Sequence, residues 1–156
     1  MNDSPLLAAM SAAPQAQSDP TEIIRAAAPS QAPDVPVDQV VQSVLAELQA
    51  PDTIWEVIGK TLFIAHPSPE APTGAMFRVL NADTPQNYIS ATYQFFQRLK
   101  GEGIRVLVTQ FKDPSIINIA KGVDKLYHKD AAMGFQVQKT SDGGFQMTID
   151  LGSAQP

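Results

Sequence analysis

Aromatic residues and glycines are missing from the first third of the sequence, and this distribution limits which part of the chain can form a hydrophobic core. All eleven aromatic residues lie between Trp55 and Phe145, and all nine glycines come after residue 58. Residues 1–50 instead hold six of the thirteen prolines. Because aromatic side chains bury the largest areas in small cores, we predict one folded domain over residues 52–152.

Negative charge is concentrated in the same N-terminal segment. Residues 1–50 carry one cation, Arg25, against six acidic residues, and the rest of the chain carries ten of each, so the whole net charge of −5 belongs to the first segment. A neutral domain with an acidic extension has no general attraction for polyanions. We therefore expect no sequence-specific nucleic acid and no membrane among its partners.

Cysteine is absent from the sequence, which excludes disulfides, thiolate catalysis and Cys-ligated metal sites. The first residues lack the basic region and the continuous apolar stretch of a signal peptide. No apolar run approaches the roughly 20 residues that span a bilayer. These features predict a cytoplasmic protein.

The segment before the domain is expected to be a flexible, partly helical, Ala/Pro-rich acidic arm over residues 1–36. Prolines separate its apolar stretches, and isolated helices of under about three turns are marginal in water. The arm is either a passive spacer or a partner-binding segment, because short apolar clusters dock into grooves. Residues 37–50 show the spacing of an amphipathic helix that packs on the domain or bridges to a partner. The residues that we expect to contact a partner protein are Leu6, Leu7, Met10, Ile23, Ile24, Val40, Val44 and Leu48.

The domain opens with strand patterns. Residues 60–67 and 74–82 are joined by a proline-rich connector and predict an antiparallel hairpin, whereas residues 52–59 predict only a short turn or helix.

The clearest helical pattern covers residues 83–103. Asp83 or Thr84 can cap its start, Pro85 suits the first turn, and Gly101 is a natural terminator.

The rest of the domain repeats this alternation. A buried strand at residues 104–111 completes a βαβ unit with parallel strands. A second helix at 113–129 and two strands joined by the turn "TSDGG" follow. The predicted class is a mixed α/β (α+β) sheet with the order β-β-α-β-α-β-β, and residues 153–156 form a tail.

This order over residues 60–151, together with Leu126-Tyr127 and Gly134-Phe135, resembles the C-terminal two-thirds of the GNAT (N-acetyltransferase-like) family. The resemblance implies that the start of the helix after the second strand would bind the pyrophosphate of coenzyme A through Thr84, Gln86 and Asn87. It also implies that Tyr127 would be the general acid for the departing thiolate.

Three departures from the family pattern predict that the chain is not an enzyme. The turn at residues 81–90 contains neither glycine nor a basic residue, although backbone N–H groups must approach phosphate closely. An inserted "KDA" lengthens the step from Tyr127 to Gly134. The proline-rich arm occupies the place of the first strand and the substrate-side helices of the family.

We therefore expect a non-catalytic structural protein with no cofactor. Degenerate domains of this type resemble small structural and internal proteins of tailed bacteriophages, which implies a virion component, in the host cytoplasm or the particle, anchored to other subunits through residues 1–50. Two alternatives stay open: a GNAT-type, acyl-CoA-dependent N-acyltransferase and a small ligand-sensing βαβ module.

The remaining polar and aromatic clusters favour structural roles. No carboxylate lies at metal-ligand spacing from His66, and Asp124 forms only an i, i+4 pair with His128, so no metal site is expected. Lys121, Lys125 and Lys129 form a solvated helix face, or they receive the acidic arm of a second copy in a self-association. Without a basic excess, the clustered aromatic residues predict core packing rather than base stacking.

Overall fold

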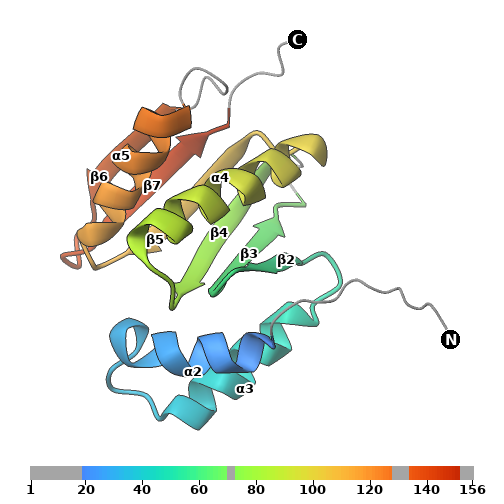
Figure 1. The fold of residues 1–156 in the computed structure, drawn as a ribbon, viewed down its shortest axis with the longest axis vertical. Helices are drawn as coiled ribbons and strands as arrows, with labels where there is room; N and C mark the ends of the chain where they lie inside the picture. The colour runs from blue at the N-terminus through green and yellow to red at the C-terminus, as the bar shows by residue number, and fades with distance from the viewer. Residues whose placement is uncertain (1–18, 70–72, 128–133, 152–156) are drawn as a thin grey trace, which may run out of the picture.

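A mixed six-stranded sheet covered by helices on both faces forms the fold in the computed structural model, which describes residues 19–69, 73–127 and 134–151 (Figure 1). The elements are α2 (Pro20–Gln31), α3 (Val37–Leu48), β2 (Ile54–Ile58), β3 (Thr61–Pro67), β4 (Gly74–Asn81), α4 (Pro85–Gly101), β5 (Val106–Phe111), α5 (Ser115–Tyr127), β6 (Gly134–Lys139) and β7 (Phe145–Asp150). No helix in these described ranges is long and apolar enough to cross a bilayer.

The strand order is β2-β3-β4-β5-β7-β6. β3 is antiparallel to both of its neighbours, β2 and β4. β4 and β5 are parallel, and β7 lies antiparallel between β5 and β6. The hairpin of β3 with β4 and the parallel crossover from β4 through α4 to β5 confirm the predicted α/β arrangement.

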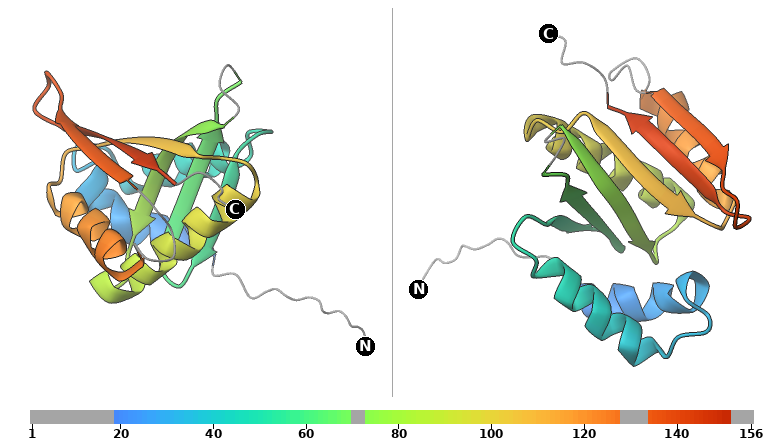
Figure 2. Two further views of the ribbon diagram at one scale, coloured as in Figure 1. Left: turned by 90° about the horizontal axis from the view of Figure 1, so that it is seen from above. Right: turned by 180° about the vertical axis from the view of Figure 1, so that it is seen from behind.

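Alternating residues of β3 separate two cores. Phe63 and Ala65 face the core beneath α4 and α5, whereas Leu62 and Ile64 face the core beneath α2 and α3, and all four are fully buried. A strand that is buried on both faces reads as a continuous apolar run, which is the character of the segment "LFIA". The two views in Figure 2 show α2 and α3 beside the β2–β4 end of the sheet, away from β6 and β7.

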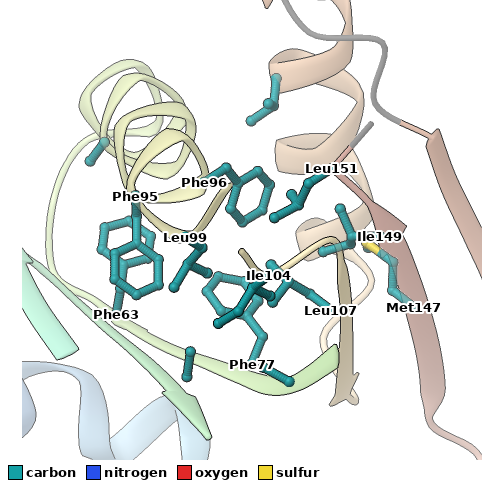
Figure 3. Close-up of a cluster of buried hydrophobic side chains, with 14 of the residues drawn as sticks. Phe63, Phe77, Phe95, Phe96, Leu99, Ile104, Leu107, Met147, Ile149 and Leu151 are labelled. Carbon is teal, nitrogen blue, oxygen red and sulfur yellow. The ribbon is translucent and has the colours of Figure 1, made fainter. Parts of the chain in front are cut away.

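Aromatic packing dominates the core beneath α4 and α5 (Figure 3). The ring of Phe63 lies 5.0 Å from that of Phe95, and Phe77 meets Phe96 edge-on at 5.4 Å between centroids. The prediction that these aromatic residues pack a core is confirmed.

The expectation of a flexible arm over residues 1–36 is corrected for residues 19–36, because α2 is part of the fold. Asp19 caps this helix by accepting a hydrogen bond from the Thr21 amide, and Pro20 occupies its first turn. Ile23 and Ile24 are 4% and 0% exposed. The large apolar residues of the sheet face supply the bulk that α2 lacks, so that a helix with only isoleucines and alanines on its inner face can pack closely.

The expectation that α3 contacts a partner is corrected in the same way. Val40, Val44 and Leu48 are buried against the sheet. These residues and the two isoleucines of α2 belong to the chain's own core, so they present no surface to a partner. Residues 1–18, with Leu6, Leu7 and Met10, lie outside the described residues, and their partner contact stays a prediction.

Three local boundaries differ from the sequence expectation. Residues 54–58 form the edge strand β2 rather than a turn or helix, and they pair with β3 through a turn in which Gly59 has φ +62°. α4 continues through Gly101, and Gly103 takes the left-handed conformation with φ +90°. α5 begins at Ser115 because the carboxylate of Asp113 caps it.

Candidate functional site

β4 and β5 are hydrogen-bonded neighbours over only part of their length. Their register covers three pairs, which end at Met76 and Val108. β4 stays paired with β3 over seven positions, and β5 stays paired with β7 through Phe111. The two parallel strands therefore diverge after their first three residues. Residues 77–81 and 109–111 consequently have no ladder partner across the opening.

A cavity of about 880 Å³ occupies this opening. Met76 and Arg78 line it from the face that carries α2 and α3, whereas Phe77 and Val79 line it from the face that carries α4 and α5. Since side chains of both faces line one cavity, the cavity passes through the sheet. We call it the through-sheet cleft. One β4 carbonyl within it, that of Val79, accepts a 2.6 Å hydrogen bond from Gln31 Nε2 of α2.

Glu47, His66 and Arg78 form an ionic cluster where the cleft meets α2 and α3. Glu47 Oε2 lies 2.6 Å from His66 Nε2, and Glu47 Oε1 accepts a 2.6 Å hydrogen bond from Arg78 Nη1. The Glu47 side chain is 19% exposed. α3, β3 and β4 each contribute one member, so the cluster is a product of the tertiary fold.

The contacts of His66 fit both of its protonation states. Thr53 Oγ1 lies 3.2 Å from His66 Nδ1 and also 3.2 Å from the Glu47 carbonyl oxygen. When the hydroxyl donates to Nδ1, the ring is neutral and Nε2–H donates to the carboxylate. When the hydroxyl donates to the carbonyl oxygen, Nδ1–H donates to the hydroxyl and the ring is an imidazolium. His66 can thus gain a proton without losing a partner.

The turn between β4 and α4 is held by a carboxylate. Asp83 accepts hydrogen bonds from the Lys60 amide at 2.9 Å, the Thr84 amide at 2.8 Å and Asn87 Nδ2 at 2.9 Å. The side-chain hydrogen bond from Asn87 and the amide of Lys60 hold the pKa of Asp83 below its usual value. Asp83 is therefore ionised at neutral pH, at the positive end of α4.

The start of α5 has the same chemistry. Asp113 Oδ1 accepts a 2.9 Å hydrogen bond from the Ser115 amide, and the backbone and side-chain hydrogen bonds of Ser115 lower the pKa of Asp113. Burial raises the pKa of Tyr88, and the charge of Asp113 raises it further. Tyr88, Asp113 and Ser115 line the through-sheet cleft, where the phenol stays neutral.

The cofactor-binding residues that the resemblance implied lie at the start of α4. Thr84 is the cap, and its hydroxyl accepts a 3.3 Å hydrogen bond from the Asn87 amide. Gln86 and Asn87 belong to the exposed first turn. Tyr127 is the last residue of α5, and its side chain lies outside what the structure describes.

The described residues of the predicted lysine face do not line the cleft. Lys121 and Lys125 are exposed on α5, whereas His128 and Lys129 lie outside the described residues. No group of three or more metal-ligating side chains occurs within residues 19–69, 73–127 and 134–151. Sequence reasoning missed Glu47 and Arg78 because no local pattern joins residues so far apart; an acidic residue on the polar edge of an amphipathic helix was the only available signal.

Comparison with known proteins shows the fold. No protein-family model and no curated protein matches the sequence. Among solved structures, an aminoglycoside 6'-acetyltransferase type Ii is similar, with a TM-score of 0.61, 13% identity, and coverage of 90% of this chain and 97% of the other. An aminoglycoside 6'-N-acetyltransferase from Enterococcus faecium is also similar, with a TM-score of 0.56, 10% identity, and coverage of 90% and 98%.

These matches correct the expectation of a non-catalytic virion component. Both similar structures are acetyltransferases, and each match covers 90% of the chain rather than only residues 60–151. The error has a physical origin: α2, α3 and β2 fold onto the sheet where a proline-rich arm had been expected. The same matches overturn the prediction that the chain is not an enzyme. The chain has a GNAT-like fold, a mixed α/β sheet with helices on both faces.

Proposed function

We propose that this chain is an N-acyltransferase of the GNAT type, which transfers an acyl group from a thioester of the coenzyme A class to an amine. The observation that carries the proposal is the divergence of β4 from β5, which opens the through-sheet cleft. The fold shared with two acetyltransferases supports it.

The opening between the strands suits the pantetheine arm of the donor. Backbone N–H and C=O groups that lack a ladder partner need hydrogen bonds. Residues 77–81 and 109–111 present such groups on the two sides of the cleft, apart from the Val79 carbonyl, which accepts from Gln31. An extended chain with amide groups can pair with them as an added strand would. The pantetheine arm carries two amides, whose spacing along an extended chain is suited to this kind of pairing.

A cleft that crosses the sheet lets the two substrates meet. The donor enters beside α4 and α5, and the amine approaches from the face of the Glu47–His66–Arg78 cluster. The amine nitrogen bonds to the thioester carbonyl carbon, the C–S bond breaks, and one amine proton is lost. The Glu47–His66 pair takes up that proton, because both side chains line the cleft and lie 2.6 Å apart. The resemblance assigns the proton for the departing thiolate to Tyr127, and this assignment stays a prediction.

The charges of the cleft indicate the acceptor class. Arg78 and Lys112 line it together with Glu47 and Asp113, and Glu47 is already paired with Arg78 and His66. Acidic groups are therefore not in excess, whereas polycationic acceptors need several of them. We expect amines with one cationic group, or with an additional anionic group, to be better acceptors than aminoglycosides.

Thiol release tests the proposed function. The full-length chain is incubated with acetyl-CoA or S-acetyl-pantetheine and a panel of amines, and free thiol is measured against an enzyme-free blank. We expect amine-dependent release together with a raised melting temperature, because a donor at 100 times its Kd stabilises the folded state by about 2.7 kcal/mol. Neither release nor a shift with any donor would overturn the proposal. Binding without release would instead favour the ligand-sensing alternative.

A further inference from the structure

We propose that this chain recognises its acyl donor through the pantetheine arm alone and leaves the pyrophosphate of coenzyme A unbound at the start of α4. The inference rests on the proposed function and names the part of the donor that the site reads. It follows from how the turn at residues 81–88 uses its own hydrogen-bond donors.

The amides of this turn are already committed. The Ala82 amide donates to the Lys60 carbonyl oxygen at 2.9 Å, and the Asp83 amide donates to Asn81 Oδ1 at 3.0 Å. The Thr84 amide is bound by the Asp83 carboxylate and the Asn87 amide by the Thr84 hydroxyl. Pro85 has no N–H. Of the orphan donors with which a helix start usually binds phosphate, the turn keeps the amide of Gln86.

Two carboxylates lie at the helix starts where the phosphates of coenzyme A would bind. The carboxylate of Asp83 occupies the positive end of α4, and that of Asp113 occupies the start of α5 beside the cleft. Each carboxylate takes the stabilisation that a helix N-terminus offers to an anion. A pyrophosphate at the mouth of the cleft would meet two like charges. Lys60 is the cation beside Asp83, and its charge already acts on that carboxylate. Lys112 lines the cleft next to Asp113, so each of the two carboxylates has one neighbouring cation.

The carboxylate of Asp83 is also held firmly in place. Asn81 accepts a 2.7 Å hydrogen bond from the fully buried Thr61 and donates a 3.2 Å hydrogen bond to the Asp83 carbonyl oxygen. On the other side, a side chain at Gly59 would come within 2.7 Å of Asp83 Oδ2. The turn between β2 and β3 is thus fitted against Asp83, and the carboxylate cannot swing aside for a phosphate without breaking its hydrogen bonds from Lys60, Thr84 and Asn87.

Comparing two donors tests the inference directly. S-acetyl-pantetheine carries the arm without phosphate or nucleotide, so kcat/KM for it and for acetyl-CoA should agree within about threefold, a difference below 1 kcal/mol. Higher ionic strength should raise the acetyl-CoA value, because salt screens the repulsion, and should leave the acetyl-pantetheine value unchanged. A preference for acetyl-CoA of more than about thirtyfold, some 2 kcal/mol, or competitive inhibition by 3′,5′-ADP would overturn the inference.

A charge variant locates the effect at the turn. Asp83→Asn removes one negative charge and should raise the ratio of kcat/KM for acetyl-CoA over acetyl-pantetheine by about two- to fivefold. Glu102→Gln removes the same charge at the opposite end of α4, where Glu102 pairs with Arg98, and should leave the ratio unchanged. An unchanged ratio in folded Asp83→Asn would contradict the exclusion by Asp83. If this variant melts below the assay temperature, the donor and salt comparisons on the natural chain decide.

The proposed function and this inference fail in different ways. No transfer from either donor would remove the proposed function and the inference with it. Transfer from acetyl-CoA but not from S-acetyl-pantetheine would overturn the inference alone and leave the acyltransferase standing.

Discussion

The carboxylate of Glu47 joins three secondary-structure elements at the edge of the through-sheet cleft. It pairs with His66 of β3 and Arg78 of β4 at 2.6 Å each. Replacing Glu47 would remove a charged neighbour from both partners, whose own side chains are 36% and 41% exposed and stay partly solvated. Asp83 has the corresponding role at the turn before α4, where it accepts hydrogen bonds from the Lys60 amide in the β2–β3 turn, the Thr84 amide and the Asn87 side chain.

Replacing Glu47 tests the ionic cluster. We expect Glu47→Gln to lower kcat/KM for acyl transfer by about tenfold to a hundredfold through misplaced His66, and to lower the free energy of unfolding by ~1–2 kcal/mol. Glu56→Gln is the matched control, because Glu56 makes a comparable ion pair with Arg98 away from the cleft residues. Steady-state kinetics and urea unfolding measure both variants. Equal kinetic losses in the two variants would contradict a role in the reaction.

The ionisation of Asp83 predicts a pH dependence of stability. Its folded pKa is lowered by the bonds from Asn87 and Lys60, so its contribution is present above the unfolded pKa and is lost as the pH falls through the folded value. Asp83→Asn should therefore be less stable than the natural chain at pH 7, and the difference should shrink below about pH 4. Urea unfolding across this range is the measurement. A difference that is constant with pH would show that the charge does not matter.

At the scale of elements, α2 and α3 complete the second face of the sheet and one side of the cleft. The pair covers the β2–β4 face of the sheet and supplies Gln31 and Glu47 to the cleft. A flexible arm would leave that sheet face bare and the cleft open on one side. The packing of α2 on the sheet should therefore contribute measurably to the free energy of unfolding.

Ile24 measures that contribution, since it is fully buried beneath α2. Ile24→Ala should lower the free energy of unfolding by about 2–5 kcal/mol, the range for isoleucine-to-alanine changes in cores. Val35→Ala serves as the control, because Val35 is 38% exposed in the connection between the helices and should change stability by less than about 0.5 kcal/mol. An Ile24→Ala chain that unfolds like the natural one would mean that α2 is not part of the cooperative fold.

At the scale of the whole molecule, the elements with local signals were predictable and the site was not. The β3–β4 hairpin, α4 and β5 follow from apolar periodicity and turn residues, and the structure confirms them. α2 was missed because its stability comes from the sheet face that it covers. The divergence of β4 from β5 was missed because it depends on register, which composition does not encode. Glu47 and Arg78 meet only once that geometry exists.

The central claim is that an acyl thioester enters the through-sheet cleft between β4 and β5, and titration of the isotope-labelled chain with S-acetyl-pantetheine tests it most directly. The account predicts saturable changes in the backbone amide resonances of residues 77–81 and 109–111, which face the opening. Resonances of β2 and of the β6–β7 turn should stay unchanged and serve as the internal control. Saturating changes confined to any other part of the chain, or no change at all, would contradict it.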